Sequence, residues 1–173
     1  MSKKIMDKDG LGKTLARLAH EVIEKNDNLD EIALVGIRSR GDLIAMRIAA
    51  RVKEISGKSI PVGAIDITFY RDDVGLKIAK DAQPTDVKFS IDGKNIILVD
   101  DVLYTGRSTR AAIDALLDIG RPKTIQLLVL IDRGHKQLPI HADYVGKNIP
   151  TSFKEIVEIK MQEMDGEDSI TIT

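Results

Sequence analysis

The sequence contains no cysteine, so disulfide bridges, zinc–thiolate sites and thiol nucleophiles are excluded. Aromatic residues make up only 3% of the chain and tryptophan is absent, which argues against base recognition by an array of stacked rings. An excess of one charge is also lacking, because 26 basic residues stand against 27 acidic ones. General attraction to nucleic acid is therefore not indicated, although a local basic patch fits this balance.

Long apolar runs are missing too, since none approaches the roughly 18 residues that cross a bilayer. The first ten residues lack the apolar core of a signal peptide, so we expect a cytoplasmic protein. The length of 173 residues favours a single domain over 1–173. With 43% hydrophobic and 31% charged residues, the chain has enough apolar material for a core.

Hydrophobic spacing predicts alternating strands and helices. Apolar residues from Leu15 to Ile23 recur at helical spacing, which predicts an amphipathic helix over about Asp9 to Lys25. Further helices are expected after Gly41 and from Arg110 to Gly120. Strands are expected at Ile32–Ile37, Ile60–Phe69, Ile96–Val99 and Ile125–Ile131, with a short strand in Ala142–Gly146, an alternating segment at Lys154–Met161 and an edge strand at Ile170–Ile172. This order predicts an α/β domain with a mainly parallel central sheet flanked by helices.

The stretch from Asn95 to Thr109 carries the clearest chemistry. A buried strand, Ile96–Val99, leads to two adjacent carboxylates, Asp100 and Asp101, and then to Thr105–Thr109 before a helix. Free backbone N–H groups at a helix start bind phosphate. The carboxylates can accept hydrogen bonds from vicinal hydroxyls, so the stretch fits a ribose 5-phosphate.

Two other polar loops directly follow predicted strands: Arg38-Ser39-Arg40-Gly41 and Asp132-Arg133-Gly134-His135. The arginines of the first loop are either ordinary surface charges or a clamp for a di-anion. Because ligands of such folds bind beyond the carboxyl ends of the strands, both loops and Asp100–Thr109 should meet at one edge of the sheet.

A charged stretch from Tyr70 to about Lys94 has little apolar content. Loops of this length in a compact domain are often lids or binding loops. The alternative is a surface hairpin without function.

The residues Ile96–Ser108 resemble the phosphoribosyl-pyrophosphate motif of type I phosphoribosyltransferases. Three more segments, Asp66–Asp73, Asp132–His135 and Gly146–Thr151, resemble one family, the bifunctional pyrimidine operon attenuator and uracil phosphoribosyltransferase. The resemblance runs from the N-terminal helix to about Val157. It implies the type I phosphoribosyltransferase fold, with a flexible lid loop at about 70–94 and a small base-covering hood to which about 131–173 contribute.

The resemblance also implies a reaction, in which uracil and phosphoribosyl pyrophosphate give UMP and pyrophosphate with Mg²⁺. The metal is expected to bind through substrate oxygens rather than by direct side-chain ligation. Asp100, Asp101 and Arg71 match catalytic positions, and Asp132, Arg133 and Val157 match the base site. Phosphoribosyl pyrophosphate and nucleotide would contact Arg38, Ser39, Arg40, Gly41, Val99, Asp100, Asp101, Val102, Leu103, Tyr104, Thr105, Gly106, Arg107, Ser108 and Thr109.

A second function implied by the family is RNA-dependent regulation. With bound UMP or UTP, such a protein binds a hairpin in pyrimidine-operon mRNA and promotes transcription termination. The positions carried over as an RNA face are Arg17, His20, Lys25, His135, Lys136 and Lys147. The sequence departs from the pattern at Ala16, where a threonine is expected, and at Lys136 and His141, where arginines are expected. A homodimer or larger homo-oligomer is expected from the same resemblance.

Three hypotheses therefore remain open. The chain is a uracil phosphoribosyltransferase that also regulates transcription through RNA, an enzyme without RNA regulation, or a phosphoribosyltransferase for another base such as a purine or orotate. The loops Arg38–Gly41 and Asp100–Thr109 contact only the shared sugar-phosphate substrate and cannot separate uracil from other bases.

Overall fold

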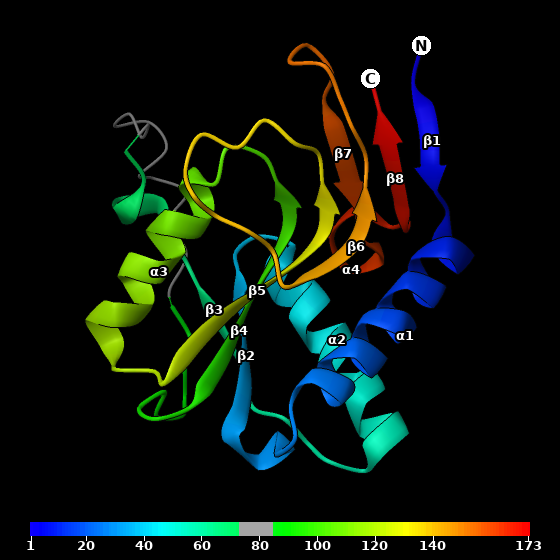
Figure 1. Cartoon of the computed structure of the whole chain (residues 1–173). Coiled ribbons are helices and arrows are strands. Elements are labelled where there is room, and N and C mark those ends of the chain that lie inside the picture. Colours follow the sequence, from blue (N-terminus) through cyan, green and yellow to red (C-terminus); the bar gives the residue numbers. More distant parts are fainter. Residues whose placement is uncertain (73–84) are drawn as a thin grey trace.

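The computed structural model describes residues 1–72 and 85–173. Its centre is a parallel sheet in the order β3-β2-β4-β5-β6 (Figure 1). The strands are β2 (Ile32–Ile37), β3 (Val62–Ile65), β4 (Asn95–Leu103), β5 (Thr124–Asp132) and β6 (Tyr144–Asn148). The predicted α/β class with a mainly parallel central sheet is thus confirmed.

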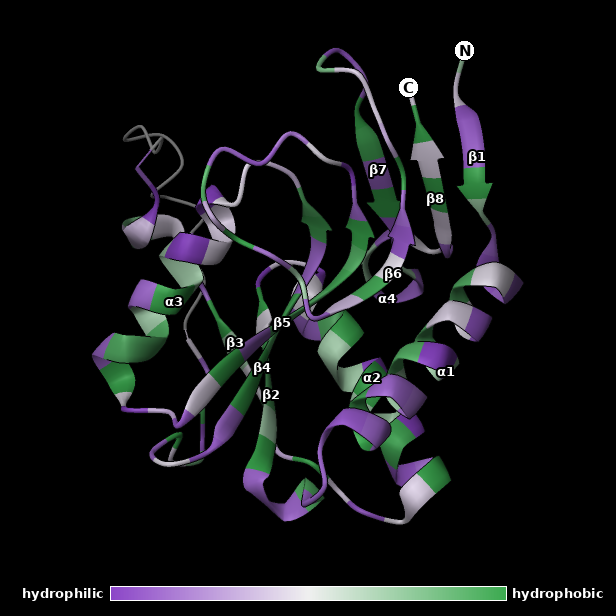
Figure 2. Ribbon diagram, in the orientation of Figure 1, coloured by the Kyte–Doolittle hydropathy of each residue, from purple (hydrophilic) through white to green (hydrophobic). Residues whose placement is uncertain are grey.

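Helices cover both faces of this sheet, which explains why β2 is apolar throughout and why β4 and β5 have apolar centres. On one face, Ile32 and Leu34 pack with α1 (Lys8–Lys25) and α2 (Gly41–Ser56). On the other, Ala33 and Val35 pack with α3 (Arg107–Ile119). Figure 2 shows hydrophobic residues along the central strands and hydrophilic residues on the loops at one end of them. No helix in the described part of the chain is long and apolar enough to span a membrane.

A second, small sheet is antiparallel and has the order β1-β8-β7. It consists of β1 (Lys3–Met6), β7 (Val157–Lys160) and β8 (Ser169–Ile172), and the short helix α4 (Gln162–Asp165) connects β7 to β8. The first and last strands therefore lie side by side (Figure 1). The prediction of an edge strand at Ile170–Ile172 is wrong, because β8 pairs on both sides. β1 was not predicted.

Three predicted boundaries change. The predicted strand Ile60–Phe69 is reduced to β3 and is followed by a short 3-10 helix at Thr68–Tyr70. Strand β4 continues through the acidic pair to Leu103, because its pairing with β5 continues to Asp132. Helix α3 begins at Arg107 rather than at Arg110. A further 3-10 helix, Leu29–Glu31, precedes β2.

The predicted lid is described only at its two ends, because residues 73–84 lie outside the described residues. At the far end, Asp86 forms an antiparallel bridge with Ala64, and Ile91 is buried against the α3 side of the sheet. This end of the stretch is therefore packed onto the domain. The lid function stays a prediction.

Candidate functional site

The two acidic residues lie inside β4, at its carboxyl end. Asp100 is buried, and its Oδ1 accepts a hydrogen bond from the N–H of Asp101 at 2.8 Å. Asp101 Oδ1 accepts in turn from the N–H of Val102 at 2.8 Å. Burial raises the pKa of Asp100 well above its usual range, and the neighbouring Asp101 charge raises it further, whereas Arg71 opposes the rise. Burial also raises the pKa of Asp101, against the opposing effects of its hydrogen bonds and of Arg40.

The loop after β4 leads into α3 through Gly106, whose φ of 92° is a left-handed conformation that suits glycine. Thr105 Oγ1 accepts a hydrogen bond from the N–H of Arg107 at 3.3 Å. The first turn of α3 presents backbone N–H groups at a helix N-terminus, which attract an anion. A cavity of about 180 Å³ lies at this point, lined by Arg71, Asp100, Val102, Leu103, Tyr104, Thr105, Gly106, Arg107, Ser108 and Thr109. Nine of the fifteen predicted sugar-phosphate residues, Asp100 and 102–109, therefore meet around one cavity.

Gly41, the last residue of the loop Arg38–Gly41, touches β4 directly. A Cβ at Gly41 would lie 2.5 Å from the carbonyl oxygen of Val99 and 3.2 Å from Asp100 Cα. Only glycine allows the loop this close to the acidic pair. The side chain of Val99 is fully buried in the core, so it cannot contact a ligand. Only the backbone of Val99 meets the loop.

The other residues of this loop point in different directions. Arg40 has φ 69° and its Nη2 donates to Asp165 Oδ1 at 3.0 Å. Arg38 forms an ion pair with Asp42 at 3.4 Å and lines a separate hollow beside β3. Ser39 is exposed, and the peptide bond between Arg38 and Ser39 is cis.

A second hollow, of about 460 Å³, lies on the other side of the acidic pair. Asp101 and Arg40 line it together with Ile156, Val157, Glu158, Ile159 and Thr173 of the small sheet and its approach. The predicted base residue Val157 therefore faces Asp101 across a hollow. The adjacent residues Asp100 and Asp101 line different spaces, one beside the helix N-terminus and one beside the small sheet.

Arg133, another predicted base residue, is largely occupied by structural contacts. Its Nε donates to Thr151 Oγ1 at 3.0 Å, and its Nη2 donates to the carbonyls of Ser152 at 3.1 Å and Glu155 at 2.7 Å. The guanidinium also lies 4.0 Å above the ring of Tyr104. Arg133 therefore fastens the segment that precedes β7 to the phosphate loop, and it shapes the site by holding this segment in place.

Asp132, the other predicted base residue in this loop, is the last residue of β5. Its Oδ1 accepts from the N–H of Gly134 at 3.0 Å, and its Oδ2 forms an ion pair with Lys136 at 3.3 Å. Asp132 is thus held at the rim of the sheet by its own loop. The ion pair thus engages Lys136, one of the residues predicted to contact RNA.

The predicted RNA residues fall into two groups. Arg17 donates to the carbonyls of Val145 and Gly146, and Lys25 donates to the carbonyl of Asp143 at 2.6 Å, so both tie α1 to β6. His20 and Lys147 are exposed on these same two elements. The structure therefore places four of the six residues on one surface of α1 and β6.

The second group is the loop after β5, which contains His135 and Lys136. The His135 ring packs at a tilt of 43° against Phe153, with ring centroids 4.0 Å apart, and meets Tyr104 edge-on at 5.9 Å. Its Nε2 lies against the carbonyl oxygen of Thr151. Sequence reasoning missed Phe153 and Thr151, since a single aromatic and a single hydroxyl residue in a loop give no pattern.

The acidic pair offers oxygen donors to a cation. Within residues 1–72 and 85–173, no group of three or more histidine, aspartate or glutamate side chains could hold a metal ion. Asp100 and Asp101 line adjacent hollows, and carboxylate oxygens are donors of the kind that suits Mg²⁺.

Comparison with known proteins agrees with this geometry. Residues 1–163 match the model of the phosphoribosyl transferase domain. The chain is 55% identical over 170 residues to a protein of Pelotomaculum thermopropionicum named bifunctional protein PyrR, covering 98% of this chain and 94% of that one. It is 53% identical over 171 residues to the protein of the same name from Acetivibrio thermocellus, covering 98% and 93%. The chain belongs to the phosphoribosyl transferase domain family and, within it, to the group of the bifunctional PyrR proteins.

Solved structures confirm the fold. The hypoxanthine phosphoribosyltransferase of Trypanosoma cruzi matches with a TM-score of 0.73 and 17% identity, covering 98% of this chain and 95% of that one. A hypoxanthine-guanine phosphoribosyltransferase of Bacillus anthracis matches with a TM-score of 0.72 and 16% identity, covering 99% and 96%. The predicted type I phosphoribosyltransferase fold is thus confirmed, and at this identity the likeness says nothing about the base.

Proposed function

We propose that this chain transfers the phosphoribosyl group of phosphoribosyl pyrophosphate to uracil, which forms UMP and releases pyrophosphate. The observation that supports the proposal most is the placement of the acidic pair between two hollows. Asp100 lines the cavity at the N-terminus of α3, and Asp101 lines the hollow beside Arg40 and Val157. A ribose bound over β4 would have its 5-phosphate on one side, with the leaving group and the base on the other.

The chemistry asked of these residues is mainly positioning and charge stabilisation. Backbone N–H groups at the start of α3 would hold the 5-phosphate. Asp100 and Asp101 would hold the ribose hydroxyls and stabilise the positive charge that develops at the anomeric carbon as pyrophosphate leaves. Arg40 would face the negative charge of the leaving group, whereas Arg71 lines the cavity of the 5-phosphate. Asp100 and Asp101 are the residues that would lie beside a bound Mg²⁺, which would supply positive charge against the phosphates of the substrate.

No proton-abstracting side chain is required by this proposal, because N1 of uracil is acidic enough for positioning to suffice. The base would bind in the hollow beside Val157, next to the segment before β7 that Arg133 holds in place. This assignment of the base site rests on the family resemblance together with the position of Val157 opposite Asp101.

The test is an assay with phosphoribosyl pyrophosphate, Mg²⁺ and a panel of bases. We expect UMP from uracil and little product from hypoxanthine, adenine or orotate. Comparable turnover of a purine or of orotate would overturn uracil as the substrate while leaving the phosphoribosyl site intact. An otherwise identical reaction without Mg²⁺ is the control for the metal, and we expect its rate to fall sharply.

We further propose that the chain binds a hairpin of pyrimidine-operon mRNA when UMP or UTP is bound. Its relatives are named bifunctional proteins, and the surface of α1 and β6 gathers Arg17, His20, Lys25 and Lys147. Contacts to phosphates from such a surface give affinity that depends on salt. A gel shift with the operon's own leader RNA, at one fixed salt concentration, should show a shift that UMP strengthens. No UMP-dependent shift at physiological salt would leave an enzyme without RNA regulation.

Self-association into a homodimer or a larger homo-oligomer is proposed on the same resemblance. Sedimentation equilibrium over a range of concentrations measures the assembly directly, and a mass that stays at that of one chain would contradict it.

A further inference from the structure

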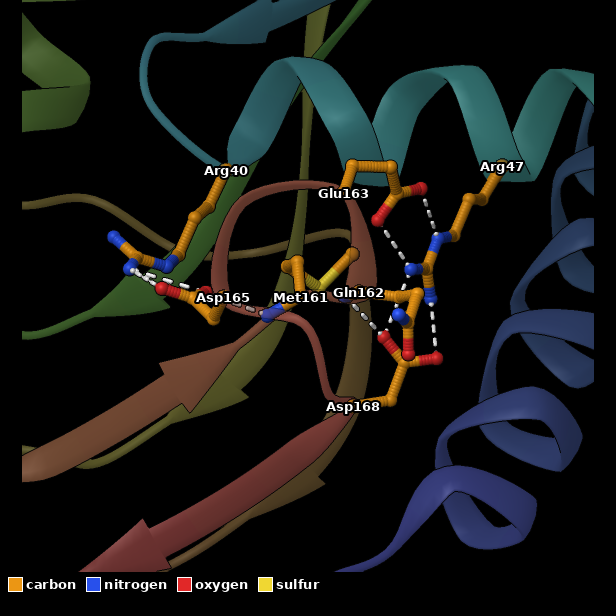
Figure 3. Close-up of polar contacts among 7 residues, drawn as sticks. All are labelled: Arg40, Arg47, Met161, Gln162, Glu163, Asp165 and Asp168. Carbon is orange, nitrogen blue, oxygen red and sulfur yellow. Dashed lines mark hydrogen bonds and ion pairs between the residues drawn. The ribbon is translucent and has the colours of Figure 1, made fainter.

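Helix α2 contacts the connection between β7 and β8 through two arginines (Figure 3). Arg40 caps the start of α2, and its Nη2 binds Asp165 of α4 at 3.0 Å and 3.3 Å to the two carboxylate oxygens. Arg47, about two turns further along, binds Glu163 of α4 and Asp168 of the following turn. Arg40 lies in the loop Arg38–Gly41, which is proposed to contact pyrophosphate, and Arg47 lies outside this loop.

Asp165 is itself held in place by the fold. Its Oδ2 accepts a hydrogen bond from the N–H of Met161 at 2.8 Å, and Met161 is fully buried. This backbone hydrogen bond lowers the pKa of Asp165, and Arg40 lowers it further, so the carboxylate stays ionised at neutral pH. A charged acceptor with a fixed position thus stands in front of a flexible arginine side chain.

Arg40 keeps unused hydrogen-bonding capacity. Its Nε is buried and has no hydrogen-bond partner among the described residues. The same side chain lines the hollow of about 460 Å³ that contains Asp101. A buried donor without a partner is costly, and a small shift of the Arg40 side chain toward an anion in the hollow would relieve that cost.

We propose that Asp165 is a positioning residue for the leaving group: by holding Arg40 through Nη2, it keeps the remaining guanidinium donors available to a pyrophosphate in the hollow beside Asp101. The inference rests on the proposed function, since the ligand is the pyrophosphate moiety of that reaction. It extends the site to a residue more than sixty positions away from the acidic pair in the sequence. Asp165 does not touch the substrate and acts through Arg40.

The test compares two variants of α4 that carry the same chemical change. Asp165→Asn weakens the contact to Arg40, and Glu163→Gln, the matched control, weakens the contact to Arg47. Binding of pyrophosphate with Mg²⁺ is measured by titration calorimetry, and KM for phosphoribosyl pyrophosphate, KM for uracil and kcat are measured in parallel. For Asp165→Asn we expect about tenfold weaker pyrophosphate binding and a similar rise in KM for phosphoribosyl pyrophosphate. The other two kinetic constants should stay within about twofold, as should all constants of Glu163→Gln.

A double variant shows whether Asp165 acts through Arg40. Arg40→Lys keeps the positive charge but loses Nε, and it should weaken pyrophosphate binding by itself. Adding Asp165→Asn to Arg40→Lys should then have little further effect, because coupled residues are not additive. Additive losses would overturn the inference.

The outcomes separate this inference from the proposed reaction. Normal pyrophosphate affinity in Asp165→Asn overturns the positioning role, even if UMP is formed. Equal losses in Asp165→Asn and Glu163→Gln also overturn it, since the effect would then be a general loosening of α4. Weakened pyrophosphate binding in Asp165→Asn alone supports it, even if uracil proves not to be the base.

Discussion

The carboxylates of β4 and those around α4 have pKa values shifted in opposite directions. Burial raises the pKa of Asp100 and Asp101, whereas hydrogen bonds from Arg47 lower the pKa of Glu163 and Asp168. Arg47 in turn has its own pKa raised by the same contacts. Cations among residues 1–72 and 85–173 thus do not offset the burial of the β4 pair, whereas the α4 carboxylates are paired with arginines. Unfavourable electrostatics of this kind often mark a functional site, and satisfied ion pairs often mark a structural one.

The two regions are also built differently. The proposed phosphate side comes from one continuous run of β4, loop and α3, and its proposed binding groups are backbone N–H groups. The small sheet joins residues 3–6, 157–160 and 169–172, which are distant in the sequence. Side-chain contacts of Arg47 and Arg133 hold this side in place. Changes on the phosphate side should therefore affect turnover, and changes on the other side should affect stability first.

The largest effect is expected at Asp101. Asp101→Asn removes a charge that would face the developing positive charge, so we expect kcat to fall on the order of 10³-fold. Circular dichroism and the melting temperature should show an intact fold. Near-normal turnover would place the carboxylate outside the reaction site and remove the contrast between the two regions.

Gly41→Ala tests the close approach of the loop Arg38–Gly41 to β4. Because the new Cβ would lie 2.5 Å from the carbonyl oxygen of Val99, the loop must move away from the acidic pair. A displacement of this size costs about 10²-fold in kcat/KM for phosphoribosyl pyrophosphate. Gly12→Ala in α1 is the control, because a Cβ there meets only the end of the Arg51 side chain, at 4.0 Å. Equal losses in both variants would contradict the explanation.

Arg133→Met tests the side of the small sheet, where we expect a change to lower the free energy of unfolding before it lowers turnover. The substitution leaves the carbonyls of Ser152 and Glu155 without their donor, so we expect the free energy of unfolding to fall by about 2 kcal/mol. Arg110→Met is the control, since its ion pair with Asp114 is about half exposed and should contribute less than about 0.5 kcal/mol. Urea denaturation of both variants measures the difference. Similar small losses would mean that Arg133 is not structural.

The smallest effects concern pH and test the opposite pKa shifts directly. The raised pKa of Asp100 makes the free energy of unfolding fall as pH rises from about 3.9, the unfolded value, through the folded value. Asp100→Asn lacks this fall, so it should gain stability relative to the unmodified protein as pH rises.

For Glu163 the sign is reversed. Its lowered pKa adds stability above the unfolded value of about 4.3, and this contribution is lost as pH falls through the folded value. Glu163→Gln should therefore be less stable near pH 7, by no more than about 1 kcal/mol, and should approach the unmodified protein near pH 3. Urea denaturation at several pH values checks both variants. If the stability of both variants, relative to the unmodified protein, changed with pH in the same direction, the opposite pKa shifts would be refuted.

The sequence predicts the phosphate side well because its signals are local. The apolar run Ile96–Val99, the acidic pair and the glycine at position 106 lie within a few residues, so their pattern indicates both structure and ligand. The ends of the strands are predicted less well from local signals. Whether β4 ends at Val99 or at Leu103 depends on its pairing with β5, which is not a local property.

The small sheet could not be predicted in the same way. β1 is a four-residue strand with two lysines, and only its pairing with β8 makes it a strand. Ile170–Ile172 resembles an edge strand until β1 covers its second side. The acidic residues of α4 gave no signal for the site, because their importance depends on contacts with arginines more than a hundred residues earlier.

The central position of β8 has a consequence for the order of folding. Every strand of the parallel sheet lies within residues 32–148, so the pairing of this sheet needs none of the later segments. β1 pairs with β8, so it needs Ser169–Ile172 in place although the two segments lie at opposite ends of the sequence. Because contacts between distant segments form slowly, we expect the hollow beside Asp101, whose wall includes β7, to be completed after the cavity at the start of α3.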